Sequence, residues 1–270
     1  MNPKISIVTG ASSGIGEATA IALQHAGYQV YAGARRLERM EHLKQHGIQP
    51  IQLDVTDDTS MRAVVNTVLD EHGRIDALVN NAGYGSYGAV EDVPMDEAHR
   101  QMEVNLFGLV RLIQLVLPAM REQHSGKIVN VTSTGGKLAL PFGGWYHASK
   151  FAVEGLSDSL RNEVRQFGID VIVIEPGGVQ TEWGGIAMQH MAQASEQSAY
   201  RDLADKVQRS FSSIDGHNAP PSVIGDLIVH AVAAERPQPR YTGGYMANLL
   251  FVKRFLPDRL FDRLMMSQFR

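Results

Sequence analysis

Short apolar runs rich in valine and isoleucine alternate with longer segments of helical period from residue 5 to residue 175. The runs show no strict alternation of polar and apolar side chains, which predicts strands that are covered on both faces, as in a parallel sheet. Six strands are predicted at residues 5–9, 28–32, 50–54, 77–80, 127–133 and 169–175, and helices at residues 14–26, 57–73, 96–123 and 146–167. This order predicts an α/β fold with a doubly wound, mainly parallel sheet and helices on both faces.

The chain departs from this pattern after residue 181. Its 270 residues suit one α/β unit, which often runs to about 250 residues, so we expect a single domain with additions. Residues 182–219 are polar and rich in Gln and Ser, and they are predicted to form a loop or lid insertion without a strand. Prolines bracket one further helix, and residues 240–242 are predicted as the seventh strand. Residues 243–270 are predicted to form an amphipathic helical extension, which Pro257 would divide into two short pieces.

Composition excludes several classes of function. The chain has no cysteine, which excludes disulfides, thiolate nucleophiles and cysteine-ligated metal centres. A net charge of −4 provides no basic field for nucleic acid. His42 and His46 have the spacing of a helical ligand pair, but their surroundings are polar and we expect a solvated face and no metal. The first apolar run is too short for a signal peptide, and no stretch approaches the roughly 18 apolar residues of a spanning helix, so we expect a cytoplasmic protein.

A glycine-rich loop follows the first predicted strand and leads into the first predicted helix. Glycines let the backbone turn tightly and approach a phosphate, and free N–H groups at a helix N-terminus favour an anion. The loop therefore predicts a site for a dinucleotide pyrophosphate, although an ordinary strand–turn–helix corner is the alternative. The residues predicted to contact the cofactor here are Gly10, Ser12, Ser13, Gly14, Ile15 and Gly16.

The end of the second predicted strand bears on which dinucleotide is bound. A site for NAD usually has an acidic residue there, whereas this chain has Arg35 and Arg36. A guanidinium binds a 2′-phosphate that a carboxylate would repel, so Arg35 predicts a preference for NADP(H) over NAD(H). The alternative is that both arginines are merely solvated. Asp54 and Val55, after the third strand, are predicted to flank the adenine.

Tyr146 and Lys150 lie four residues apart at the start of a predicted helix and so share one helix face. A nearby ammonium stabilises phenolate, which predicts a lowered pKa for Tyr146 and proton exchange with an alcohol or carbonyl oxygen. Ser133 ends the fifth predicted strand, where open α/β sheets place ligand-binding groups. Its hydroxyl could hold the substrate oxygen beside the tyrosine.

These motifs together resemble the short-chain dehydrogenase/reductase family in its compact, Rossmann-type branch. The resemblance covers residues 4–181 and recurs weakly near residues 220–241. It includes the family's TGxxxGxG glycine motif, its NNAG at residues 80–83 and its YxxxK at Tyr146 and Lys150. It implies that NADP(H) is also contacted by Asn81, Ala82, Gly83, Tyr146, Lys150, Pro176, Gly177, Val179 and Thr181.

The resemblance also implies a role for each catalytic residue. Tyr146 would be the general acid/base, Ser133 would orient and polarise the carbonyl, and Lys150 would bind the nicotinamide ribose and lower the tyrosine pKa. Asn105 would hold a water that relays protons from Lys150, although it could instead satisfy helix backbone groups. Asn80 and Asn81 are expected to tie the fourth strand to its neighbour. Hydride would pass directly between the nicotinamide and the substrate carbon.

The segment between Ser133 and Tyr146 is apolar and is predicted to form one wall of the substrate pocket. Leu138, Phe142 and Trp145, together with Met188, indicate an apolar substrate, with core packing as the alternative. The branch resembled includes hydroxysteroid- and retinol-type dehydrogenases and bacterial aldehyde reductases. It implies a lipophilic alcohol, ketone or aldehyde.

The sequence thus predicts an NADP(H)-dependent oxidoreductase that interconverts a carbonyl and an alcohol. The alternatives are a non-catalytic NADP-sensing regulator and a sugar-nucleotide epimerase or dehydratase. By the family resemblance, the helices at residues 96–123 and 146–167 are expected to form a homodimer or homotetramer. For the C-terminal tail, a lid or packing role is favoured over membrane-surface contact, because Pro257 breaks it and Asp258 and Asp262 offset its basic charge.

Overall fold

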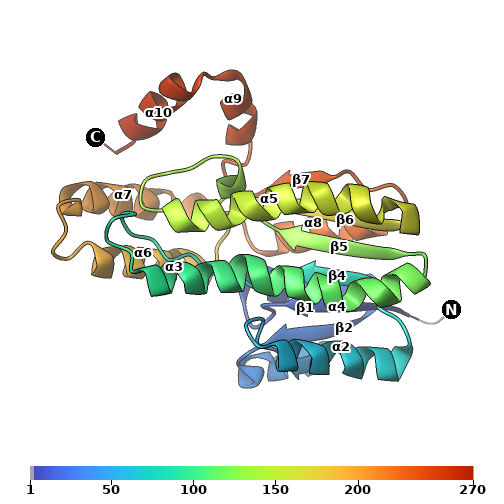
Figure 1. Ribbon diagram of the computed structural model, residues 1–270. Helices are drawn as coiled ribbons and strands as arrows, with labels where there is room; N and C mark the ends of the chain where they lie inside the picture. Colours follow the sequence, from blue (N-terminus) through green and yellow to red (C-terminus); the bar gives the residue numbers. More distant parts are fainter. Residues whose placement is uncertain (1–2, 270) are drawn as a thin grey trace.

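Seven parallel strands form one sheet in the order β3-β2-β1-β4-β5-β6-β7 (Figure 1). The computed structural model describes residues 3–269, apart from the side chain of residue 215. The strands are β1 (Lys4–Thr9), β2 (Tyr28–Ala34), β3 (Gln49–Gln52), β4 (Ala77–Asn80), β5 (Gly126–Val131), β6 (Ile169–Pro176) and β7 (Arg240–Gly243). All seven predicted strands are confirmed, with ends shifted by a few residues.

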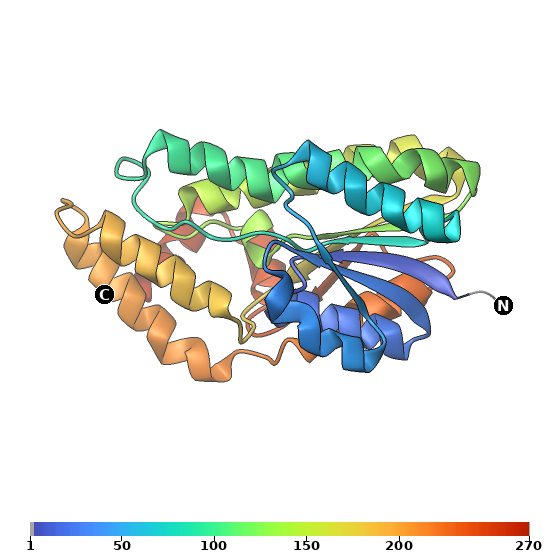
Figure 2. The same ribbon diagram turned by 90° about the horizontal axis from the view of Figure 1, so that it is seen from below.

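Helices cover both faces of the sheet, as the absence of strict alternation in the strands predicts. Figure 2 shows the sheet between the two helical layers. One layer holds α1 (Gly14–His25), the 3-10 helix η1 (Leu37–His46) and α8 (Ser222–Ala233). The other layer holds α2 (Asp58–His72), α4 (Gly108–Glu122) and α5 (Gly144–Val164).

The predicted helix at residues 96–123 is not regular. It consists of α3 (Met95–Met102), one π-helical turn, η2 (Glu103–Phe107), and α4. Such turns insert one extra residue and often occur at functional sites. By length and hydropathy alone the stretch Met95–Glu122 could cross a membrane, contrary to the expectation above. Leu112, Val116 and Met120 of this stretch are fully buried against the sheet, which identifies it as a core helix of the fold.

The insertion between β6 and β7 forms two helices, α6 (Glu182–Ala194) and α7 (Arg201–Ile214), followed by the 3-10 turn η5 (Asp215–His217). Both helices lie beyond the carboxyl ends of the strands, at the left of Figure 1. The two ends of the insertion meet, because Gln180 N donates to Ala219 O at 2.9 Å and Ala219 N donates to Gly178 O at 3.1 Å. The insertion is therefore a closed excursion from the sheet.

The C-terminal extension forms α9 (Leu249–Phe255) and α10 (Asp258–Ser267), with the break at Pro257 as predicted. Figure 1 draws this pair outside the three layers. Phe261 and Met265 of α10 pack with Leu138, which belongs to the segment between Ser133 and Tyr146. One face of the extension therefore covers part of the predicted substrate wall.

Candidate active site

The three glycines of the loop between β1 and α1 stand where a side chain would clash or strain the backbone. Gly10 and Gly14 have positive φ angles of 66° and 59°, which other residues rarely adopt. A Cβ on Gly16 would lie 2.3 Å from Gly10 O. The loop therefore brings Gly14 and Ile15, which line a cavity, to the start of α1, where backbone N–H groups can bind a pyrophosphate.

The segment after β4 packs directly on this loop. The Thr9 hydroxyl accepts hydrogen bonds from Asn81 N at 3.0 Å and Ala82 N at 2.9 Å, and the Asn81 amide donates to Thr9 O at 3.0 Å. The Asn80 amide donates to the Asn130 side chain at 3.0 Å across β4 and β5. The expected structural roles of Asn80 and Asn81 are thereby confirmed.

Positive charge collects where β2 and β3 end. Arg35 and Arg36 are exposed at the rim of the cavity, beside Asp54. Desolvation acts to raise the pKa of Asp54, but hydrogen bonds from Thr56 and the charges of Arg35 and Arg100 together hold it below its usual value. Sequence reasoning missed Arg100, because its place beside the end of β3 depends on tertiary packing.

Ser133, Tyr146 and Lys150 meet at the other end of the cavity. The Ser133 hydroxyl accepts a bond from Gly135 N at 2.9 Å and donates to Pro176 O at 3.4 Å, and it is near enough to Tyr146 to act on the pKa of that hydroxyl. Lys150 Nζ donates to Val131 O at 3.0 Å and lies 5.9 Å from the centre of the Tyr146 ring. The three side chains can therefore act on one substrate oxygen and its proton.

The pKa of Tyr146 differs from the sequence expectation. Burial raises it to about 12, and the hydrogen bond with Ser133 acts in the opposite direction. Burial also lowers the pKa of Lys150 to about 8, against the opposing charge of Glu154. The expectation of a lowered tyrosine pKa considered only the ammonium, whereas desolvation disfavours both charged forms in this enclosed place.

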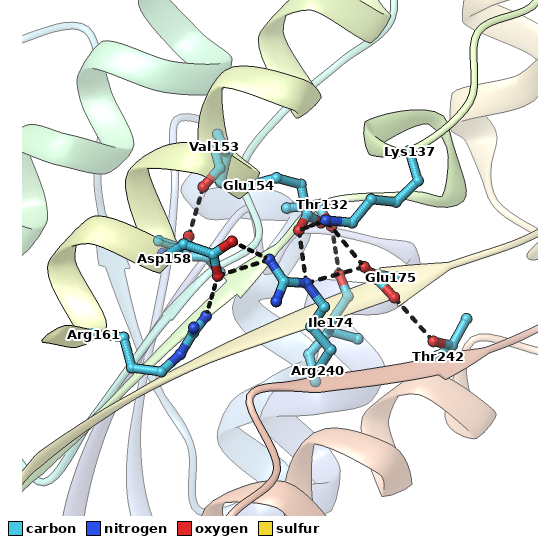
Figure 3. Close-up of polar contacts among 12 residues, drawn as sticks. Thr132, Lys137, Val153, Glu154, Asp158, Arg161, Ile174, Glu175, Arg240 and Thr242 are labelled. Atoms are coloured by element: carbon cyan, nitrogen blue, oxygen red, sulfur yellow. Dashed lines mark hydrogen bonds and ion pairs between the residues drawn. The ribbon is translucent and has the colours of Figure 1, made fainter. Parts of the chain in front are cut away.

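Two buried carboxylates lie close to this centre and face two cations (Figure 3). Glu154 of α5 pairs with Lys137 Nζ at 2.7 Å and with Arg240 Nε at 3.0 Å. Glu175 of β6 lies 3.5 Å from Arg240 Nε, and its pKa is raised by burial and by the charge of Glu154. The cluster joins α5, β6 and β7 to Lys137, four residues after Ser133.

Glu154→Gln is expected to lower the free energy of unfolding by about 1–3 kcal/mol, because it leaves Lys137 and Arg240 short of one buried negative charge. Urea unfolding of both forms measures the difference. Glu163→Gln, on the exposed side of the same helix, is the matched control. Equal stability of the two variants would mean that the cluster contributes nothing through Glu154.

Asn105 lies in the π-helical turn η2 and holds the chain after β4. Its carbonyl accepts a bond from Tyr84 N at 3.0 Å, and its amide donates to Tyr84 O at 2.9 Å and to Ser149 Oγ at 3.0 Å. The alternative weighed for Asn105 was the satisfaction of helix backbone groups. Two of these bonds instead hold the segment at Tyr84, and the third is to a side chain of α5. A water relay through Asn105 stays a prediction.

His147 is a positioning residue that sequence reasoning left without a role. Leu140 N donates to its Nε2 at 3.0 Å, so its Nδ1 carries the proton and donates to Gly135 O at 2.9 Å. Burial lowers the pKa of His147, against the Gly135 bond, which keeps it neutral. The ring therefore fixes the segment between Ser133 and Tyr146 from inside.

The substrate side of the cavity differs in part from the prediction. Leu138 and Met188 line it, whereas Phe142 and Trp145 do not. Phe142 is buried in a cluster with Tyr87 and Tyr146, which is the core-packing alternative. Other apolar and aromatic lining residues, which sequence reasoning missed, come from the chain after β4, the insertion and the C-terminal extension. They include Tyr87, Trp183, Phe211, Met246, Leu249, Met265 and Phe269.

Trp183 is the missed residue nearest to the chemistry. Its ring centre lies 4.9 Å from that of Tyr146, and Gly85 makes room for it, because a Cβ there would lie 2.4 Å from Trp183 Cζ2. A signal was present in the sequence, since Trp183 comes only two residues after Thr181; in the structure it is the second residue of α6.

One cavity of about 930 Å³ connects these groups, from Arg35 past the glycine loop to Tyr146 and the C-terminal extension. Most of the predicted cofactor residues line it; Gly16 does not and lies beneath the loop. Its length, its glycine cradle and the cations at one end fit a nicotinamide dinucleotide. Asn105 does not line the cavity; it holds Tyr84, which does, through hydrogen bonds to the Tyr84 backbone.

Comparison with known proteins agrees with this geometry. The family model described as short chain dehydrogenase matches residues 4–192. A 3-ketodihydrosphingosine reductase of Bacteroides thetaiotaomicron is 37% identical over 265 residues, 96% of each chain. The crystal structure of a short-chain dehydrogenase from Streptomyces avermitilis is 32% identical with a TM-score of 0.81, covering 98% of this chain and 96% of that one. Other solved neighbours are complexes with NADP, with 5-hydroxy-NADP or with NAD.

Proposed function

The chain belongs to the short-chain dehydrogenase family of oxidoreductases, and from that premise we propose that it interconverts a carbonyl and an alcohol on a lipophilic small molecule with NADP(H). One observation carries the proposal. A single cavity has a glycine cradle and exposed arginines at one end and Ser133, Tyr146 and Lys150 at the other.

The residues that would hold the cofactor are those already described around the loop. Backbone N–H groups at Gly14 and Ile15 would face the pyrophosphate, and Arg35 would face a 2′-phosphate. No acidic side chain stands at the end of β2 to select the unphosphorylated ribose. When bound, the nicotinamide supplies or accepts hydride at the substrate carbon.

The protein's own part in the reaction is the handling of the substrate oxygen and its proton. With a pKa of about 12, Tyr146 is protonated at neutral pH and is ready to donate a proton to the oxygen of a carbonyl undergoing reduction. Ser133 would hold the same oxygen, because it lines the cavity beside Tyr146 and acts on the pKa of the Tyr146 hydroxyl. The Lys150 ammonium would stabilise the phenolate left after proton transfer.

This assignment predicts a fall in activity as the pH rises through about 8. Lys150, with a pKa of about 8, carries its ammonium below that pH and loses it above, so kcat/KM for carbonyl reduction should decrease there. The stability of the fold changes in the opposite direction. The unfolded chain keeps the proton of this lysine up to a pKa of about 10.4, whereas the folded chain loses it near pH 8. The lysine's contribution to the free energy of unfolding therefore rises from about pH 8 to about pH 10. A flat profile between about pH 7 and 9.5 would contradict the role of Lys150.

The apolar lining supports a lipophilic substrate. Leu138, Trp183, Phe211 and Met265 approach the reaction centre from different elements, and such pockets usually hold apolar ligands with few polar anchors. The relative from Bacteroides thetaiotaomicron is named for a long-chain keto compound. We extend that class to this chain as part of the proposal.

A panel of aliphatic ketones and aldehydes of increasing chain length, followed by NADPH absorbance with NADH in parallel, tests the proposal. We expect oxidation of NADPH with long-chain substrates and a weaker rate with NADH. Turnover confined to small polar carbonyls would refute the substrate class, and no turnover with either nucleotide would refute the activity.

A homo-oligomer is part of the same proposal. Three large apolar side chains, Met95, Phe107 and Phe151, are exposed on α3, η2 and α5. These elements are neighbours on the outer side of one helical layer (Figure 1). A second copy packed on this face would bury all three.

A further inference from the structure

We propose that the helical pair α9–α10, residues 249–269, is a peripheral membrane-binding element that seats the substrate side of the cavity on an anionic lipid surface. The binding itself stands on the geometry of the pair. The delivery of substrate from that surface rests on the proposed function.

Exposed apolar surface is concentrated in this pair. Fourteen large apolar side chains are exposed in the described residues, and six of them lie within residues 251–266. Phe251 and Phe255 are 67% and 66% exposed and contact each other edge-on, with ring centres 4.9 Å apart. A soluble monomer seldom leaves such a patch in water, so the patch indicates a partner.

The pair is apolar on two sides, with different surroundings on each. Phe261, Met265 and Phe269 are buried against the protein, whereas Leu260 and Leu264 continue the apolar surface of α10 outward and are exposed. Packing on the protein accounts for the first set and leaves the second unexplained. With seven and ten residues, neither helix can span a bilayer, but both can lie in its interface.

Basic residues alternate along the sequence with the exposed apolar residues of the pair. Residues 249–269 contain four basic and two acidic residues in a chain whose net charge is −4. Lys253 Nζ forms an ion pair with Asp258 Oδ1 at 2.5 Å. Arg254, Arg259 and Arg263 have no ion-pair partner within residues 3–269. The acidic residues therefore offset less of the basic charge than their number suggests, and three guanidinium groups are available to lipid phosphates.

The same pair closes the substrate end of the cavity. Leu249, Met265 and Phe269 line it together with Met246. A long-chain lipid leaving a bilayer at Phe251 and Phe255 would meet apolar side chains of α9 and α10 on its way to Tyr146. The surface that would touch the membrane and the wall of the pocket therefore belong to the same helical pair.

The competing occupant is a second copy of the chain. A twofold interface sets identical patches against each other, which would bring Arg254, Arg259 and Arg263 of both copies together. Of the two acidic residues in α9 and α10, Asp258 already pairs with Lys253, and Asp262 alone remains to offset these arginines. Such an interface would therefore be short of negative charge. The charge distribution therefore favours an anionic bilayer.

Sedimentation of the full-length protein with phosphatidylcholine vesicles, with and without phosphatidylglycerol, tests the proposal. We expect binding to the anionic vesicles that weakens with salt. Phe251→Ser combined with Phe255→Ser should reduce binding about tenfold or more, and Arg254→Glu combined with Arg263→Glu should reduce it for anionic vesicles alone. Val90→Ser with Val223→Ser, which removes exposed apolar groups elsewhere, should leave binding unchanged.

Separate readouts distinguish this proposal from the proposed function. Tyr146→Phe should bind vesicles like the wild type whatever the enzyme's substrate. The Phe251/Phe255 variant should keep its unfolding midpoint and its turnover of water-soluble carbonyls, and should lose turnover of a ketone presented in vesicles. The proposal would be overturned if the wild-type protein did not bind anionic vesicles, or if the Phe251/Phe255 variant bound them as the wild type does. A drop in molecular mass for that variant without any vesicle binding would assign the patch to a second copy.

Discussion

Replacement of Tyr146 by phenylalanine should lower kcat for carbonyl reduction by about 10²–10⁴-fold, the usual contribution of a positioned general acid. The substitution removes one hydroxyl from a ring that is otherwise held by packing with Tyr87 and Trp183. The ring, and with it the walls of the cavity, should stay in place. The affinity for NADPH, measured by fluorescence titration, should therefore change little.

Ser133→Ala is the informative companion variant. It removes the hydroxyl that contacts Tyr146 and leaves the proton donor present, so its effect on kcat should be smaller than that of Tyr146→Phe. Ordinary turnover by Tyr146→Phe with intact cofactor binding would show that the proton comes from another group. Loss of NADPH binding in that variant would instead show that Tyr146 supports the cofactor site.

Replacement of Arg35 by aspartate should shift the preference from NADP(H) toward NAD(H) by about a hundredfold. A charge-assisted bond to the 2′-phosphate contributes about 1.5–3 kcal/mol, and a carboxylate in its place adds repulsion. The same carboxylate can accept hydrogen bonds from the ribose hydroxyls of NAD. The ratio of kcat/KM values for the two nucleotides, measured at one ionic strength, gives the shift directly.

Arg165→Asp, an equal change of charge at an exposed position outside the cavity lining, controls for the overall field. Arg36→Asp separates the two neighbouring arginines, since both line the cavity. An unchanged preference in Arg35→Asp together with a shift in Arg36→Asp would move the phosphate contact by one residue. No shift in either variant would refute NADP selection at the end of β2.

The sheet and the cofactor end of the site could be predicted because local sequence determines them. Gly10, Gly14 and Gly16 are required by the backbone of one turn, and Tyr146 and Lys150 are neighbours by helical spacing alone. Ser133 follows β5 directly, so its place at the sheet edge depends on no distant segment.

The substrate side could not be predicted, because it is assembled from distant segments with ambiguous patterns. Residues 182–219 are polar overall, although α7 has a marked apolar face, and their helices pack on Tyr87 and Phe142. Phe142 is apolar whether it faces a ligand or the core, so composition could not decide between the two. The pKa of Tyr146 depends on burial by Trp183 and other side chains, which spacing along one helix does not reveal.

The closed excursion between β6 and β7 has a consequence for how enzymes of this shape diversify. Its ends are hydrogen-bonded to each other at Gly178, Gln180 and Ala219. The geometry of the sheet therefore does not depend on the length of the chain between them. Doubling the length of such a loop costs only about 0.6 kcal/mol in closure entropy. Substrate range can therefore change through insertion, deletion or exchange of this one segment, while the glycine loop and the residues proposed for proton transfer stay the same.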